Sequence, residues 1–140
     1  VLPDRNKYIE QVDKWNAIST VIKVSEDDLA WLYPEQDQIA ITEKWLADGA
    51  QLVVITKGSY GIIGVTNSGI VSVPGVKVDV VDTVGAGDTV GAIIVEAIVE
   101  KGINALVGDT LRQVLVRATK AAGVTCSRAG ANPPTKAEIH

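Results

Sequence analysis

The segment DTVGAGD, residues 82–88, marks the place where extended chain gives way to an apolar helix. Gly85, Ala86 and Gly87 are so small that a ligand oxygen can approach the backbone closely. The unpaired amides and the positive dipole end of a helix also point at such a place. The segment therefore predicts an anion site at the start of a helix over 85–100. Apolar residues on nearly all sides of that helix predict that it is buried.

Asp88 falls in the first turn of this helix, where a carboxylate repels a bound phosphate. The repulsion makes sense if Asp88 takes a proton from a substrate hydroxyl while the amides hold the phosphoryl group that this hydroxyl attacks. A structural explanation competes with this one: Asp82 or Thr83 caps the helix, and Asp88 only favours its dipole. The local pattern alone leaves both interpretations open.

Two familiar phosphate signatures do not fit the sequence. A Walker A loop requires G-x-x-x-x-G-K-[ST], which does not occur. The dinucleotide fingerprint G-x-G-x-x-G can start at Gly85, but Val90 then stands in place of its third glycine. Its acidic partner would be Asp109, which falls inside the next helix and not at a strand end. A Rossmann oxidoreductase is therefore disfavoured.

A second segment, TKGSYG at residues 56–61, follows the continuous apolar run 52–55. The run predicts a strand covered on both faces, as in a parallel sheet between helices. Ligands of open α/β sheets bind at the carboxyl ends of strands, where small and hydroxyl residues suit nucleotide phosphates or ribose. A plain strand-to-hairpin turn explains these residues as well.

A third segment, residues 121–135, is a helix end that runs into a loop of small residues. Small side chains leave room for a flat adenine ring, or for backbone carbonyls around a cation. Taken by itself, this segment is only a Gly- and Pro-containing loop.

The remaining patterns predict an α/β fold in a single domain. A polar helix is expected from Pro3 to Trp15, and Ser25 is expected to cap a helix. Further helices are expected over 39–48 and 106–122. The expected strands and β segments are 20–24, 52–55, 61–66, 70–73 and 76–81, with a hairpin turn at 67–69.

Charge and composition exclude several classes of protein. The formal net charge is −4 and no Lys/Arg cluster occurs, so neither nucleic acid nor an anionic membrane is an expected partner. No apolar run reaches the roughly 20 residues that cross a bilayer, which favours a cytoplasmic protein. The single cysteine, Cys126, is expected to be a small buried residue, and with one His no Cys/His metal cluster is expected.

Together, and in their order along the chain, segments 56–61, 82–88 and 121–135 resemble the ribokinase, or PfkB, superfamily. Its second signature, D-T-x-G-A-G-D, matches residues 82–88 at all six specified positions. Segments 21–34 and 125–135 look most like bacterial fructokinases. The resemblance implies a ribokinase-like three-layer α/β/α fold, with 1–140 as its C-terminal ATP-binding and catalytic part. It also implies ATP-dependent phosphorylation of a sugar hydroxyl, with fructose to fructose 6-phosphate as the expected reaction.

The resemblance also implies roles for individual residues. Asp88 would be the catalytic base, with the amides of Gly85, Ala86 and Gly87 as the anion hole. ATP would bring Mg²⁺, and members of the family often bind a monovalent cation such as K⁺ where Asp82 and Gly130 fall here. The nucleotide-binding residues would be Thr56, Gly58, Gly61, Ala122, Gly130 and Asn132.

The sequence departs from the family in three ways. Val90 stands where many members have an aromatic residue. The N-x-x-E element aligns with 25–28, where Ser25 and Asp28 replace its Asn and Glu, so a capping box is favoured over a metal role. Members also run to about twice this length, as ordinary α/β enzymes do. An N-terminal part with the lid and most sugar contacts is therefore expected to be missing, which predicts negligible activity for 1–140 alone.

Such a cut would expose a strand edge and apolar helix faces, which invites a partner piece or a homo-oligomer. Within the family, ribokinase, 2-keto-3-deoxygluconate kinase and nucleoside kinase are alternatives to fructokinase. Outside enzymology, a non-catalytic nucleotide-binding module is the alternative.

Overall fold

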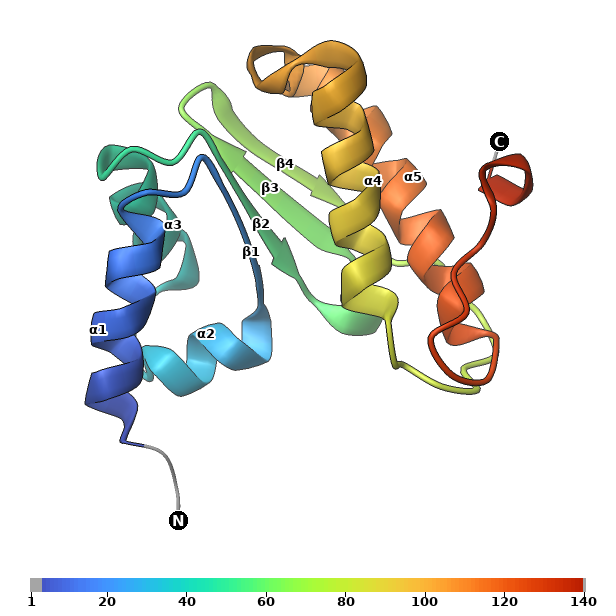
Figure 1. The fold of residues 1–140 in the computed structure, drawn as a ribbon, viewed down its shortest axis with the longest axis horizontal. Coiled ribbons are helices and arrows are strands. Elements are labelled where there is room, and N and C mark those ends of the chain that lie inside the picture. Colours follow the sequence, from blue (N-terminus) through green and yellow to red (C-terminus); the bar gives the residue numbers. More distant parts are fainter. Residues whose placement is uncertain (1–3, 140) are drawn as a thin grey trace.

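The computed structural model describes residues 4–139, which form three layers (Figure 1). A four-stranded sheet lies between two groups of helices, with α1 to α3 on one side and α4 and α5 on the other. This arrangement confirms the predicted α/β class and its helix, sheet, helix layering. Pro3, the expected first residue of the N-terminal helix, lies outside the described residues.

The helices of the first layer are α1 (Arg5–Asn16), α2 (Glu26–Leu32) and α3 (Gln38–Ala47). Ser25 caps α2 as predicted, because its Oγ accepts the backbone N–H of Asp28 at 3.0 Å. The same hydroxyl donates to the carboxylate of Asp28 at 2.6 Å, so the side chains of both residues form hydrogen bonds at the start of the helix.

The strands of the sheet are β1 (Val21–Ser25), β2 (Leu52–Thr56), β3 (Ile62–Thr66) and β4 (Gly69–Val73), in that order. β1 and β2 are parallel and are joined through α2 and α3, whereas β2, β3 and β4 are antiparallel neighbours. Within residues 4–139, β1 pairs only with β2, so the predicted free strand edge is present.

β2 is the centre of the fold because both of its faces are covered. Its side chains alternate between two cores, with Leu52 and Val54 facing α4 and α5 and Val53 and Ile55 facing the first layer. All four are fully buried. This explains why the run is continuously apolar and does not alternate.

The expected β character of residues 76–81 is wrong, since no strand forms there. The segment lies against α5, where Val76 and Val78 pack over Gly123. Its end is tied to α5 by the N–H groups of Val81 and Asp82, which both donate to the carbonyl of Cys126. β-branched residues favour an extended chain, but this segment lies against α5 and pairs with no strand of the sheet.

The second helical layer consists of α4 (Ala86–Lys101) and α5 (Gly108–Cys126). Short 3-10 turns η2 (Ile103–Ala105) and η3 (Lys136–Ile139) flank α5. α5 buries the predicted stripe, which includes Leu111, Leu115 and Ala118.

The prediction that α4 is buried on all sides is wrong. Ile93, Ile94 and Ala97 face the core, but Val95 and Val99 are 60% and 80% exposed. These two side chains are exposed because no described residue covers that face of the helix. No helix within 4–139 is long and apolar enough to cross a membrane.

Candidate functional site

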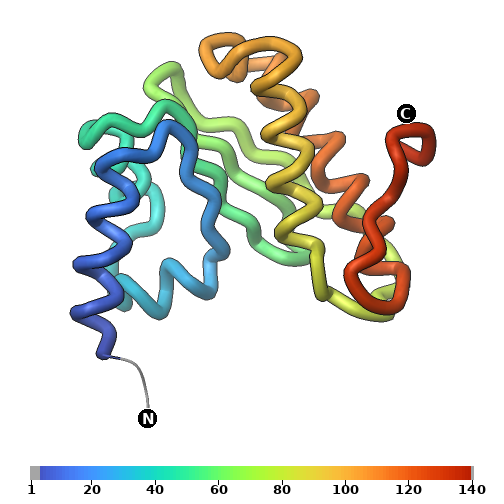
Figure 2. The backbone as a smooth tube through the Cα atoms, in the orientation of Figure 1, coloured from blue at the N-terminus to red at the C-terminus, as the bar shows by residue number. Residues whose placement is uncertain are grey.

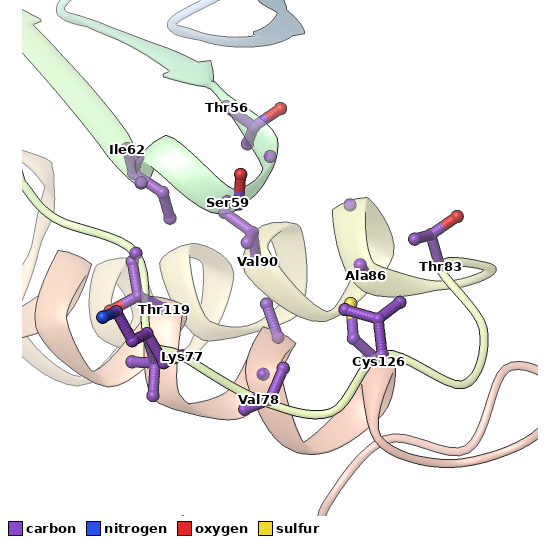
Figure 3. A pocket seen from close by; sticks show the side chains of 18 residues that line it. Thr56, Ser59, Ile62, Lys77, Val78, Thr83, Ala86, Val90, Thr119 and Cys126 are labelled. Carbon is purple, nitrogen blue, oxygen red and sulfur yellow. The ribbon is translucent and has the colours of Figure 1, made fainter.

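A cleft of about 700 Å³ opens between the end of β2 and the facing ends of α4 and α5 (Figure 3). Segment 75–80 crosses its floor and brings Lys77 and Val78 into it. We call this space the α4/α5 cleft. It is lined by Thr56, Gly58, Ser59, Gly61, Ile62, Gly75, Val76, Lys77, Val78, Val80, Thr83, Ala86, Gly87, Val90, Thr119, Ala122, Gly123 and Cys126.

The start of α4 depends on a glycine and not on a side-chain cap. Gly85 is the N-cap residue and has a φ of 81°, in the left-handed region that disfavours a side chain. A Cβ at this position would lie 2.9 Å from the Cβ of Ala131, so the loop after α5 also requires a glycine here. The alternative in which Asp82 or Thr83 caps the helix is therefore wrong.

This start leaves backbone donors unused. Within residues 4–139, the N–H groups of Gly87 and Asp88 have no hydrogen-bond acceptor, and that of Ala86 makes only a 3.3 Å contact to the carbonyl of Thr83. Ala86 and Gly87 line the cleft. Free amides and the helix dipole together make this end of α4 suited to an anion.

Asp88 lies in the first turn of α4, next to these amides, and its side chain is exposed. It makes no ion pair or hydrogen bond with the described residues, so its carboxylate is free to accept a proton. An exposed, unengaged carboxylate beside an anion site is the arrangement that a phosphoryl-transfer base needs.

The opposite wall carries the second predicted segment. Thr56 ends β2 and Gly58 begins the 3-10 turn η1 (Gly58–Tyr60), and both line the cleft. Gly61 has a φ of 107° and packs so closely on β4 that an added Cβ would lie 2.0 Å from the carbonyl oxygen of Val73. Lys57 is held toward α2 by an ion pair with Glu26 at 3.6 Å.

Of the third segment, Ala122 lines the cleft, whereas Gly130 and Asn132 do not. Both lie in the loop after α5, where the N–H of Asn132 donates to the carbonyl of Gly130 at 2.9 Å. Figure 2 shows this loop coming back beside the chain that leads into α4. The structure therefore places them at one end of the site and not inside the cleft.

Asp82 joins the two segments at that end. Its Oδ1 accepts the N–H of Val84 at 3.0 Å and its Oδ2 accepts the N–H of Gly130 at 2.9 Å. These hydrogen bonds, first from Val84 and then from Gly130, hold the pKa of the carboxyl below its ordinary value. Each oxygen keeps a lone pair, so the carboxylate still fits as one ligand of a monovalent cation.

The described residues offer no magnesium site built from several protein carboxylates. No group of three His, Cys, Asp or Glu side chains within 4–139 could hold a metal ion. Mg²⁺ commonly binds through one or two carboxylates together with substrate phosphates, so the residues present fit an ion that arrives with a nucleotide.

The comparisons with known proteins agree with this geometry. Residues 1–138 match the family of pfkB family carbohydrate kinases. The chain belongs to this family. A fructokinase from Rhizobium leguminosarum bv. trifolii is 41% identical over 97 residues, which are 69% of this chain and 30% of that protein.

Two solved structures show the same fold. The fructokinase with bound ATP from Xylella fastidiosa has a TM-score of 0.79 and 20% identity, over 88% of this chain and 41% of that one. The fructokinase double mutant of Vibrio cholerae O395, in its fructose, ADP and potassium ion bound form, has a TM-score of 0.76 and 24% identity, over 90% and 40%. The chain thus spans less than half the length of these PfkB relatives. The predicted family and ribokinase-like fold are confirmed.

Sequence reasoning missed Lys23, a basic residue within the β-branched run of β1. A Cβ on Gly87 would lie 3.3 Å from its Nζ, and one on Gly91 would lie 3.8 Å from its Cε. The two glycines, four residues apart on one face of α4, leave the groove that the lysine occupies. The four-residue spacing of the two glycines and the single charged residue inside an apolar strand are the sequence features from which Lys23 could have been predicted.

The prediction that Cys126 is buried is wrong, because its side chain is half-buried and lines the cleft. The last turn of α5 extends past the core and forms a wall of the cleft (Figure 3). Lys77 was also missed, and no sequence pattern distinguishes it.

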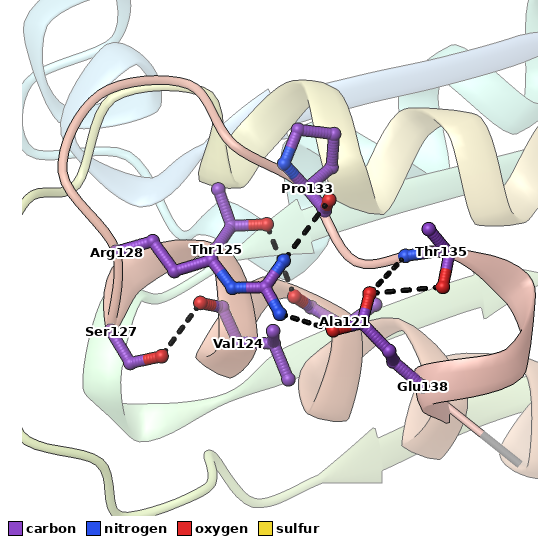
Figure 4. Close-up of polar contacts among 8 residues, drawn as sticks. All are labelled: Ala121, Val124, Thr125, Ser127, Arg128, Pro133, Thr135 and Glu138. Atoms are coloured by element: carbon purple, nitrogen blue, oxygen red, sulfur yellow. Dashed lines mark hydrogen bonds and ion pairs between the residues drawn. The ribbon is translucent and has the colours of Figure 1, made fainter.

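A polar cluster fixes the loop beyond α5 (Figure 4). The guanidinium of Arg128 pairs with Glu138 and also donates to the carbonyl of Pro133 at 3.4 Å. Glu138 accepts the backbone N–H of Thr135 at 2.7 Å. The bond from Thr135 and the pairing with Arg128 lower the pKa of Glu138 to about 2. The cluster thus holds the 128–138 loop against the end of α5.

Proposed function

We propose that the protein carrying this chain transfers the γ-phosphoryl group of ATP to a hydroxyl of fructose, giving fructose 6-phosphate. The observation that carries the proposal is the start of α4, where free amides at Gly87 and Asp88 adjoin the exposed carboxylate of Asp88. Ala86 and Gly87 line the α4/α5 cleft, and Asp88 lies next to Gly87 in the chain. An anion site and a base in one helical turn are what phosphoryl transfer to an alcohol requires.

In this proposal, Asp88 accepts the proton of the sugar hydroxyl as its oxygen attacks the γ-phosphorus. The P–O bond to ADP breaks, and ADP leaves with the electron pair. The amides of Gly85, Ala86 and Gly87 face the negative charge that spreads over the transferred group. Lys23 adds a positive charge beside Gly87. A full charge attracts the phosphoryl group more strongly than the amide dipoles do alone.

The nucleotide is proposed to lie along the cleft. Thr56 and Gly58 would meet its phosphates or ribose, and Gly61 holds their loop in place. Ala122 leaves room for the adenine between α5 and segment 75–80, with Gly130 and Asn132 at the rim. The mostly apolar walls suit a flat base. Magnesium bound to the phosphates would neutralise part of their charge.

A monovalent cation is proposed at Asp82 and Gly130. The carboxylate lies at the start of the anion-site segment and is kept ionised by two amide donors. The Vibrio cholerae fructokinase structure is described as potassium-bound, which supports testing K⁺ first.

Fructose is preferred over ribose, 2-keto-3-deoxygluconate and nucleosides because the Rhizobium leguminosarum relative is named a fructokinase, although the sugar contacts are expected outside 1–140. The cytoplasm remains the predicted location. A non-catalytic nucleotide module has the same cleft, and in it Asp88 would only favour the dipole of α4.

The test is an ATP-dependent phosphorylation assay of the intact gene product with each of these acceptors, beside the 140-residue chain alone. The proposal expects fructose 6-phosphate from the intact protein and almost none from the chain. Preference for another sugar would reassign the substrate within the family. ATP binding without turnover on any acceptor would favour the nucleotide-binding module.

A further inference from the structure

Two buried hydroxyl groups meet where the start of α4 touches the end of α5. Thr89 is 6% exposed and Thr125 is fully buried, and their Oγ1 atoms lie 2.8 Å apart. Apolar side chains such as Ile93, Leu115 and Ala118 close the buried middle of this interface. Farther along the two helices, an ion pair between Glu96 and Arg117 lies at its partly exposed edge. The contact between the two buried hydroxyl groups lies at the end of the interface that adjoins the site.

Each hydroxyl also reaches a carbonyl one turn back in the chain. The Oγ1 of Thr89 lies 2.9 Å from the carbonyl oxygen of Gly85. The Oγ1 of Thr125 lies 3.1 Å from that of Ala121, a bond drawn in Figure 4. Each hydroxyl has one proton, so one arrangement runs as a chain in which Thr125 donates to Thr89 and Thr89 donates to Gly85.

The carbonyl of Gly85 belongs to the same peptide group as the N–H of Ala86. A hydrogen bond to that carbonyl fixes the plane of the peptide and strengthens its N–H as a donor. The methyl group of Thr125 also faces Gly85, since a Cβ there would lie 3.8 Å from its Cγ2. Thr125 thus contacts the residue whose backbone sets the direction of the amides.

Threonines often bond to a carbonyl of their own helix without any further role. Thr42 does so, with its Oγ1 2.7 Å from the carbonyl of Ile39, although it is fully buried. Thr119 does the same with Val116. Thr89 and Thr125 differ because each also reaches the other helix.

We infer that Thr89 and Thr125 are a positioning pair that fixes the amides of Ala86 and Gly87 relative to the α5 wall of the nucleotide cleft. This rests on the proposed function and adds two residues to it. Neither residue lines the α4/α5 cleft. Their effect passes through the Gly85 peptide, and a small displacement of well-aligned donors is costly in rate.

The test replaces each threonine by valine, which keeps the shape and removes the hydroxyl, and by serine, which keeps the hydroxyl. After either Val substitution the remaining threonine still has its own helix carbonyl as acceptor, so no buried donor is orphaned and folding should survive. We expect Thr89→Val and Thr125→Val to lower kcat by about 10-fold to 100-fold, with KM for ATP within about threefold. Thr89→Ser and Thr125→Ser should restore kcat to within about threefold of the natural protein.

Thr42→Val is the matched control, a buried threonine that bonds only its own helix, and it should leave kcat unchanged. Valine variants with natural kcat would overturn the inference. Equal losses in the valine and serine variants would also overturn it, because they would indicate that any change of packing lowers kcat and that the hydroxyl has no particular role.

A second measurement does not depend on turnover. Amide hydrogen exchange at residue 89, whose N–H donates to the Gly85 carbonyl at 2.9 Å, should be faster in the valine variants and unchanged in the serine variants, since the Gly85 peptide would open more often. Unchanged exchange in all variants would overturn the inference. If the natural protein phosphorylates no sugar, the proposed function fails, and the exchange result still decides whether the pair positions the amides.

Discussion

The carboxylate of Asp82 and the backbone N–H of Gly130, 48 residues apart in sequence, are joined by a 2.9 Å hydrogen bond. This bond connects the segment that enters α4 with the loop that leaves α5. The carboxylate thereby helps to hold two predicted site segments together at one end of the cleft, beside the bonds from the N–H groups of Val81 and Asp82 to the carbonyl of Cys126.

Asp82→Asn should lower the midpoint of thermal unfolding at neutral pH. The carboxylate accepts N–H donors on both oxygens, whereas an amide accepts on one and would face the other donor with its own NH₂ group. Scanning calorimetry against Asp79→Asn, an exposed residue in the same segment, measures the effect. Equal midpoints for the two variants would show that the bond contributes nothing to stability.

Gly61→Ala should destabilise the fold far more than Gly69→Ala. Both glycines have positive φ, at 107° and 133°, so alanine at either position introduces backbone strain of about 1–3 kcal/mol. Only at Gly61 would the new Cβ collide, at 2.0 Å from the carbonyl oxygen of Val73. The loss of unfolding free energy at Gly61 should therefore exceed about 4 kcal/mol, measured with urea. Similar losses for both variants would contradict the close packing.

Lys23→Met should reduce kcat by about 10-fold to 100-fold while KM for fructose stays nearly constant, because the lost charge stabilises the transferred group and not the sugar. Methionine keeps most of the length that lies along Gly87 and Gly91. Lys14→Met, on the exposed face of α1, is the control for a general loss of charge. A higher KM for fructose with normal kcat would place Lys23 in sugar binding instead.

Stability should depend on Glu138 between about pH 4.5 and pH 2. Its pKa is about 2 in the folded protein against an ordinary 4.5, so the unfolded chain binds the proton first as the pH falls. A depressed pKa stabilises the fold above the unfolded value, and this stabilisation is lost as the pH falls through the folded one. The difference in unfolding midpoint between the natural protein and Glu138→Gln should therefore shrink from about pH 6 to pH 2. A constant difference would contradict the pairing with Arg128.

Local patterns were enough to predict most of the fold. The apolar run of β2 predicted a strand covered on both faces, and the stripe of α5 predicted its buried face. The prediction of a strand at 76–81 was wrong because β-branched residues favour an extended backbone but do not supply a pairing partner. The prediction that α4 is buried was wrong because an apolar residue is not buried unless something covers it, and residues 4–139 leave Val95 exposed.

The parts of the candidate site that could be predicted are those where the backbone conformation requires a particular residue type. Positions 85 and 61 require glycine because neighbouring atoms exclude a side chain. Such a requirement is visible in the sequence as a glycine in a motif. Lys23, Lys77 and the Thr89–Thr125 pair act through tertiary contacts, which no local pattern contains. The roles proposed for Asp88 and the nucleotide-binding residues are tested by kinetics.

The most direct test of the central claim is the rate of fructose phosphorylation by the intact gene product with Asp88 replaced by asparagine. Asn keeps the size of the side chain, and because Asp88 is exposed and makes no bond with other described side chains, the fold should be unaffected. We expect kcat to fall by about 100-fold to 10,000-fold, with ATP binding retained. A variant that turns over fructose at the natural rate would contradict the assignment of Asp88 as the base.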